Sequence, residues 1–137
     1  MTAITAAVNR QAKGVPKTRR VLMANSITIV KGELVGILDA DGLAVKGVTG
    51  ATVVWIIGVA AETKTSGTGG ADWIQVEYDR EYLFAATSIT QAMLGDAMLI
   101  VDNNTIDETS AGSATVGKLT EYVSATLGWV HIPGVTT

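Results

Sequence analysis

The chain has 137 residues and a mass of 14.2 kDa, with 47% apolar but only 5% aromatic residues, 15 Gly, 2 Pro and no Cys. This size predicts one domain, and the lack of Cys with a single His excludes disulfides, thiolate metal sites, a cysteine nucleophile and multi-His metal sites. No apolar run approaches the length of a membrane span, and the N-terminus lacks a signal-peptide core, so we expect neither. These features argue against an enzyme.

The formal charge of −3 is unevenly distributed along the chain. Residues 1–31 carry six basic side chains and no acidic one, which gives +6, whereas residues 32–137 carry four basic and thirteen acidic ones, which gives −9. A basic end on an acidic body predicts that the end has a task of its own.

Residues 1–17 have only a weak helical pattern, in Ala3, Ala6, Ala7 and Val8, and Gly14 and Pro16 would end any helix there. We therefore expect residues 1–19 to form a flexible basic arm. The alternative is a first edge strand packed on the body.

Residues 20–137 read as one β-rich domain, an antiparallel barrel or a sandwich, because turn signals recur every 8–12 residues or so. Asp41-Gly42 predicts a hairpin, and the apolar run 53–61 predicts a fully buried strand that places Trp55 in the core. A Thr/Ser/Gly loop is expected at 63–70. Strands are predicted at residues 21–24, 27–30, 34–38, 43–45, 53–61, 74–79, 81–86, 98–101, 116–123 and 127–132.

The clearest alternation lies in residues 74–79, where Ile74, Val76 and Tyr78 share one face of an antiparallel strand with one wet side. One stretch beyond the arm is predicted helical. It covers residues 88–94, starts from a Ser/Thr cap and is closed by Gly95.

Three motifs suggest chemistry that their context does not support. Residues 112–119 match a phosphate-binding loop up to Lys118, but Leu119 stands where magnesium needs Ser or Thr, so we interpret a Gly turn entering a strand. The acidic residues near turns miss the spacing of a calcium loop and are interpreted as solvated turns; they are Asp39, Asp41, Asp102, Asp107 and Glu108. His131 alternates with its neighbours as a strand residue, and no nucleophile elbow accompanies it. We expect no catalytic residue, metal or cofactor.

The basic end has three possible roles. It could neutralise phosphates of a nucleic acid, but it has no aromatic residue for stacking and the acidic body would repel a polyanion. It could be a solubilising tail, or it could become ordered on a protein partner, which we favour. Its candidate contact residues are Arg10, Lys13, Lys17, Arg19 and Arg20.

Five segments together resemble the small head decoration, or cement, proteins of tailed bacteriophages. They are GELVG at 32–36, IGVA at 57–60, AMLGDAMLIVDNNT at 92–105, VGKL at 116–119 and WVHI at 129–132. The resemblance covers residues 30–133 or so and does not indicate a subfamily.

This resemblance implies a β-rich module that binds the outer surface of the expanded capsid, with the major capsid protein as its partner and neither nucleic acid nor membrane involved. It also implies a homo-oligomer, a trimer or else a dimer, located on the virion and in the host cytoplasm during assembly. The basic arm would become ordered on neighbouring capsid subunits. Trp73, Trp129 and His131 are candidates for the interface between protomers.

Two other roles remain open from the sequence. One is another virion part, such as a tail or head-fibre module. The other is a carbohydrate-binding β domain, although the chain has few aromatic residues for that.

Overall fold

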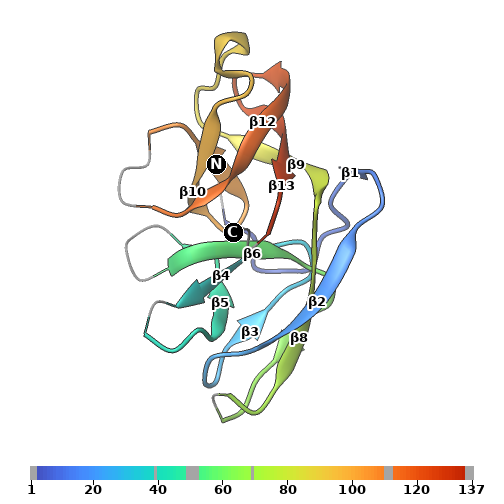
Figure 1. Ribbon diagram of the computed structural model, residues 1–137, viewed down its shortest axis with the longest axis vertical. Helices are drawn as coiled ribbons and strands as arrows, with labels where there is room; N and C mark the ends of the chain where they lie inside the picture. The colour runs from blue at the N-terminus through green and yellow to red at the C-terminus, as the bar shows by residue number, and fades with distance from the viewer. Residues whose placement is uncertain (1–2, 39, 49–52, 69, 110–112, 135–137) are drawn as a thin grey trace.

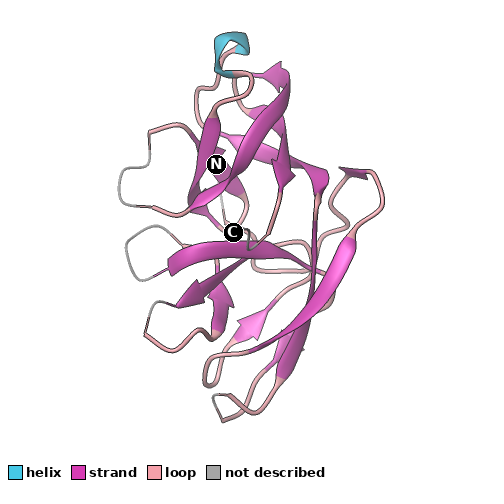
Figure 2. Cartoon of the chain, in the orientation of Figure 1, coloured by secondary structure: helices cyan, strands magenta, loops and turns pink. Residues whose placement is uncertain are grey.

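The computed structural model describes residues 3–38, 40–48, 53–68, 70–109 and 113–134. This part is nearly all β, as predicted, and its one helix is a single 3₁₀ turn (Figure 2). In chain order the elements are β1 (Ala12–Lys13), β2 (Lys17–Leu22), β3 (Thr28–Ile29), β4 (Leu34–Leu38), β5 (Ala44–Lys46), β6 (Val53–Ala60), β7 (Lys64–Thr65), β8 (Trp73–Tyr78), β9 (Arg80–Ala86), η1 (Gln91–Met93), β10 (Ala97–Asp102), β11 (Thr105–Asp107), β12 (Thr115–Ser124) and β13 (Leu127–Ile132).

Five strands close into a small barrel in the order β9–β11–β10–β12–β13, and β13 pairs back with β9 (Figure 1). The pairing of β9 with β11 is parallel, and the other four pairings are antiparallel. β1 pairs with the first half of β9, at Glu81 and Tyr82. Of the two architectures expected from the sequence, the structure contains the barrel.

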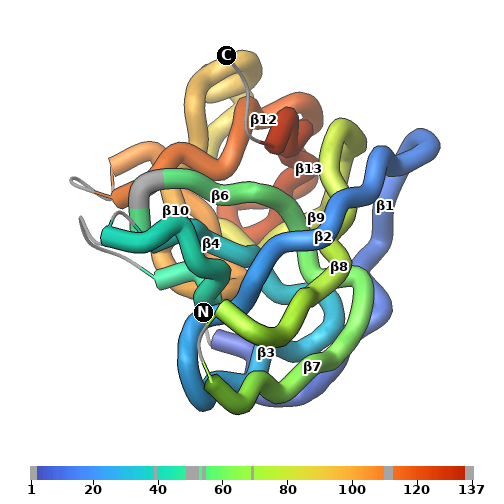
Figure 3. The backbone as a smooth tube through the Cα atoms, turned by 60° about the horizontal axis from the view of Figure 1, so that its bottom comes forward, coloured from blue at the N-terminus to red at the C-terminus, as the bar shows by residue number. Residues whose placement is uncertain are grey.

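A second, five-stranded antiparallel sheet has the order β2–β8–β6–β4–β5. A parallel bridge from Met23 to Ala44 brings the chain after β2 back against β5. The short β3–β7 pair lies on the same side of the molecule as β2 and β8 (Figure 3).

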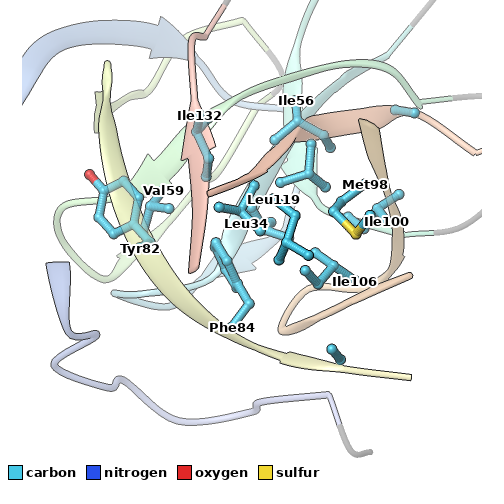
Figure 4. Close-up of a cluster of buried hydrophobic side chains, with 14 of the residues drawn as sticks. Leu34, Ile56, Val59, Tyr82, Phe84, Met98, Ile100, Ile106, Leu119 and Ile132 are labelled. Carbon is cyan, nitrogen blue, oxygen red and sulfur yellow. The ribbon is translucent and has the colours of Figure 1, made fainter. Parts of the chain in front are cut away.

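Two clusters of buried side chains lie on opposite faces of β4 and β6. Leu34 faces the barrel interior, where it packs among side chains such as Phe84 and Leu119 (Figure 4). Its neighbour Val35 points the other way, into a cluster with Ile74 and Val76 from β8. These two strands therefore bury both faces, and the two halves of the fold share them.

Two irregularities in the β4–β6 pairing explain why the prediction of a buried Trp55 is wrong. The register skips Ile57 between Gly58 and Ile56, and it shifts again between Trp55 and Val53. Each extra residue reverses the alternation of side chains. Val53, Ile56 and Val59 consequently share the barrel face, whereas Trp55 pairs with Ile37 and is 46% exposed, not in the core.

Glycines that predict turns in the sequence lie at turns in the structure. Gly42 has a φ of 73° in the β4–β5 hairpin, where the Leu38 N–H donates to the Leu43 carbonyl. The helix predicted at 88–94 is wrong in length and capping: only the 3₁₀ turn Gln91–Met93 forms, and Thr90 at its N-cap makes no side-chain cap hydrogen bond, whereas Gly95 follows with a φ of 87° as a closing glycine would. Ile74 and Val76 are buried in β8 and Gln75 is exposed, as their alternation predicts.

We expect Gly117→Ala to destabilise the protein by about 3 kcal/mol, because a Cβ on Gly117 in β12 would overlap the His131 carbonyl oxygen of β13. The measurement is the free energy of unfolding in urea. Gly67→Ala is the matched control, since the nearest atom to its added Cβ is Asp72 Oδ2 at 3.7 Å and its φ is not positive. Equal stabilities of the two variants would contradict the close approach of β12 and β13.

Candidate functional site

The basic N-terminal segment lies along the body instead of extending away from it. The Ile4 backbone N–H donates to Asn103 Oδ1, and the Asn103 side-chain amide donates to the Ile4 carbonyl, both at 2.9 Å. Val8 donates to the Lys31 carbonyl, and Leu83 in β9 donates to Gln11. Residues 17–19 belong to β2. The described part of the segment thus packs on the body, with Ala12–Lys13 as the edge strand β1, and deleting residues 1–19 would remove half of β2.

Arg10 is the main anchor of this segment. Its Nε donates to the Gly32 carbonyl at 2.7 Å, one terminal nitrogen to Leu83 at 2.9 Å and the other to Asn104 Oδ1 at 2.7 Å. The guanidinium also stacks on Phe84, with its central carbon 4.3 Å from the ring centre. Burial lowers the pKa of Arg10 to about 10, because the charged form loses hydration.

Glu33 is a second polar anchor and has no exposed surface. One carboxylate oxygen accepts the Val30 N–H at 3.0 Å, and the other accepts a hydrogen bond from the Asn103 side-chain amide. Because that amide also donates to Ile4, Glu33 fixes the orientation in which Asn103 holds the N-terminal segment. Burial raises the pKa of Glu33, against the opposing effects of Asn103, Val30 and Lys46.

Two of the predicted contact residues, Lys13 and Arg20, lie above the rings of two predicted interface residues, Trp129 and Trp73. Lys13 Nζ lies 4.2 Å from the ring centre of Trp129 and 2.7 Å from Glu121, and the Arg20 guanidinium lies 4.6 Å from that of Trp73. Arg20 is opposite Gln75 in the β2–β8 register, so Trp73 is its diagonal neighbour on the same face. We call Thr18, Arg20, Trp73 and Gln75 the β2–β8 face; all four are exposed.

Lys17, Arg19 and His131 have partners within the body as well. Asp79 lies between Lys17 Nζ, at 3.4 Å, and His131 Nε2, at 3.2 Å. The Arg19 guanidinium stacks 4.2 Å from the centre of the Tyr78 ring. His131 lies in β13 opposite Lys118 and Glu81, which agrees with its interpretation as a strand residue.

Sequence reasoning missed Glu33, Asn103 and Phe84 as residues that hold the N-terminal segment. Glu33 lies between Gly32 and apolar Leu34, and that isolated acid in an apolar context was the one available signal. Nothing in the sequence pairs it with Asn103, seventy residues later.

Three of the acidic residues that could suggest a metal instead stabilise turns. Asp41, Asp102 and Asp107 each accept the backbone N–H two residues on. Asp39 lies outside the described residues. Within the described ranges, no group of three or more His, Cys, Asp or Glu is placed to hold a metal ion, and no helix is both long and apolar enough to cross a bilayer.

Arg10→Met is expected to destabilise the protein by about 3 kcal/mol, because it leaves the Gly32 and Leu83 carbonyls without their charged donor. Urea unfolding measures the loss, and amide exchange should show faster exchange at Val8 and Leu83. Arg20→Met, which removes an exposed guanidinium, should change stability by about 0.5 kcal/mol or less. Similar losses in both variants would argue against the anchoring role of Arg10.

Glu33 should make the folded state less stable as pH rises. Since its pKa is higher in the folded than in the unfolded protein, the folded state binds its proton more tightly, and that contribution is lost as pH increases from 4.5 through the folded value. The stability of the native protein relative to Glu33→Gln should therefore be greater at pH of about 4 than at about 7. Denaturant titrations at a series of pH values test this, and parallel curves for the two proteins would refute it.

Comparisons with known proteins do not assign the chain to a family. No protein-family model matches the chain, and no curated protein matches its sequence.

Proposed function

We propose that the chain is a decoration protein of a tailed bacteriophage, which binds the outside of the expanded capsid and strengthens it. The observation that carries the proposal is the preformed β2–β8 face, on which Arg20 lies against the exposed ring of Trp73. Arg and Trp are the residue types most often found to dominate binding energy at protein interfaces. A rigid β-sheet that displays such a pair suits a protein that holds other subunits together.

The chemistry of this face favours an acidic protein surface as its partner. β2 brings Lys17, Arg19 and Arg20 to one edge of the second sheet. Of these three, Arg20 points to the β2–β8 face, where Trp73 supplies apolar area beside it and Thr18 and Gln75 supply hydrogen-bonding groups. A capsid surface with carboxylates around an apolar depression would match it in charge and in polarity.

The packed N-terminal segment changes how binding would occur. A free arm would have to become ordered on the capsid and would lose conformational entropy there. Here Arg10 and Lys13 already have partners within the body, so residues 3–13 brace the barrel. In this proposal the capsid contacts the β2–β8 face, whose backbone is fixed before binding.

Stabilisation of the shell would follow from linkage. A protein that binds the assembled, expanded shell more tightly than its free subunits lowers the free energy of the shell. Of the three interface candidates Trp73, Trp129 and His131, this proposal assigns Trp73 to the capsid contact. If protomers associate through Trp129 and His131, several β2–β8 faces on one oligomer would bind neighbouring capsid subunits with increased avidity.

Co-sedimentation with expanded and unexpanded capsids tests the proposal. We expect the native protein to bind expanded capsids preferentially, and Trp73→Ala with Arg20→Ala to weaken binding by about a hundredfold, as the loss of a central hot-spot pair would. Lys64→Ala, a lysine change on β7, is the control that should bind normally. Circular dichroism should show that all variants are folded.

Two results would overturn the proposal. Absence of binding to expanded capsids by the folded native protein would refute the capsid as partner. Normal binding by the double variant would refute the role of the β2–β8 face.

A further inference from the structure

One edge of the second sheet is open to a further strand. β2 is the first strand in the order β2–β8–β6–β4–β5 and lies on the outside of the molecule (Figure 1). In the described part of the chain, its six residues pair with β8 and with no other strand. The chain meets β5 only after β2 has ended, through the bridge from Met23 to Ala44. Such an unpaired edge can hydrogen-bond to a strand of another chain.

The register shows which backbone groups of β2 point away from β8. In an antiparallel pair, residues that exchange two hydrogen bonds with the residue opposite alternate with residues whose N–H and C=O point outward. The Met23 N–H donates to the Asp72 carbonyl at 2.8 Å, and these two residues continue the β2–β8 register. Counting back in steps of two, Arg19 is bonded to β8, so the backbone groups of Thr18 and Arg20 face the open edge.

A second hydrogen bond supports this assignment. Gln75 lies opposite Arg20, and its carbonyl accepts the Ala61 N–H at 2.9 Å, on the side away from β2. Among the described residues, no backbone–backbone hydrogen bond from another segment reaches Thr18 or Arg20. The edge therefore offers the N–H and C=O groups of two alternate residues, which is the spacing that an antiparallel strand needs.

The side chains of β2 determine which strand this edge can accept. β2 carries Lys17, Arg19 and Arg20 and no acidic residue. Lys17 pairs with Asp79, but neither arginine takes part in any of the four ion pairs found within the described ranges. A second copy of this chain would place the same three cations against these, and like charges on neighbouring strands repel. A segment with a carboxylate opposite Arg20 has the complementary charge.

We propose that the open edge of β2 binds an extended acidic segment of a partner protein by antiparallel strand addition. The backbone of the segment pairs with Thr18 and Arg20. Its carboxylate opposite Arg20 lies on the β2–β8 face with Trp73, because opposite residues of an antiparallel pair have their side chains on the same face. Backbone pairing provides affinity, and the side chain opposite Arg20 provides selectivity. The inference does not depend on the proposed function, since it specifies a kind of segment and not the capsid.

Two N-methylated peptides separate strand addition from attraction between charges. The probe is a blocked hexapeptide in which glutamate and valine alternate. When its glutamates lie opposite Thr18 and Arg20, their N–H groups point to β2 and those of the valines point to solvent. N-methylation of the glutamates removes the donors that face β2 and should weaken binding about tenfold. N-methylation of the valines, which gives a peptide of the same charge and composition, should leave the affinity unchanged.

Amide NMR of the intact protein provides the readout. On titration with the unmethylated peptide, the N–H resonances of Thr18 and Arg20 should shift and exchange more slowly with solvent. Those of Arg19 and Val21, which are already bonded to β8, should change little. Arg20→Gln should weaken the affinity about threefold, as the loss of one exposed ion pair would. Lys64→Gln, on β7, is the matched control and should bind the peptide normally.

Three results would overturn the proposal. Equal protection of the Thr18, Arg19, Arg20 and Val21 amides in the free protein would show that the edge is already paired. Equal affinities for the two methylated peptides would show that charge alone holds them. No shift at millimolar peptide would show that the cations only guard the edge against other strands. None of these results bears on capsid binding, which is measured separately by co-sedimentation.

Discussion

The fold depends on the burial of both faces of β4 and β6. Leu34 and Val59 complete the barrel interior, while Val35 and Ile57 belong to the cluster on the other side. A strand with two apolar faces cannot lie at a surface, so the barrel must cover one face, and β8, β3 and the chain around Met23 the other. Removing either cover would expose the same two strands to water, which couples the stabilities of the two halves.

The N-terminal segment illustrates how charge and position combine. From the sequence alone, its excess of positive charge predicts a free arm that binds an acidic partner. In the structure these cations contact groups of the body. Lys13 contacts Glu121 and Trp129, Lys17 contacts Asp79, and Arg10 contacts backbone carbonyls and Phe84. The exposed pairs contribute little each, whereas the half-buried Arg10 determines where the segment lies.

The sequence predicted those features that depend on neighbouring residues. The alternation in residues 74–79, the Asp41-Gly42 turn and the position of Gly95 all follow from local preferences, and the structure contains them. Trp55 was predicted wrongly because the bulges in β6 arise from its pairing with β4, which no local pattern encodes. The same limit applies to the candidate site: Arg10 and Trp73 were identified as candidates, but their partners are supplied by tertiary structure.

The contact between Ile4 and Asn103 joins residues 99 positions apart, and β1 pairs with β9 across almost seventy residues. During synthesis, the N-terminal segment therefore leaves the ribosome long before its binding surface exists. Contacts so distant in sequence make folding slow, because a large loop must close before they contribute. The contacts of Lys13 with Glu121 and Trp129 can therefore form only after the last two barrel strands, β12 and β13, have been synthesised.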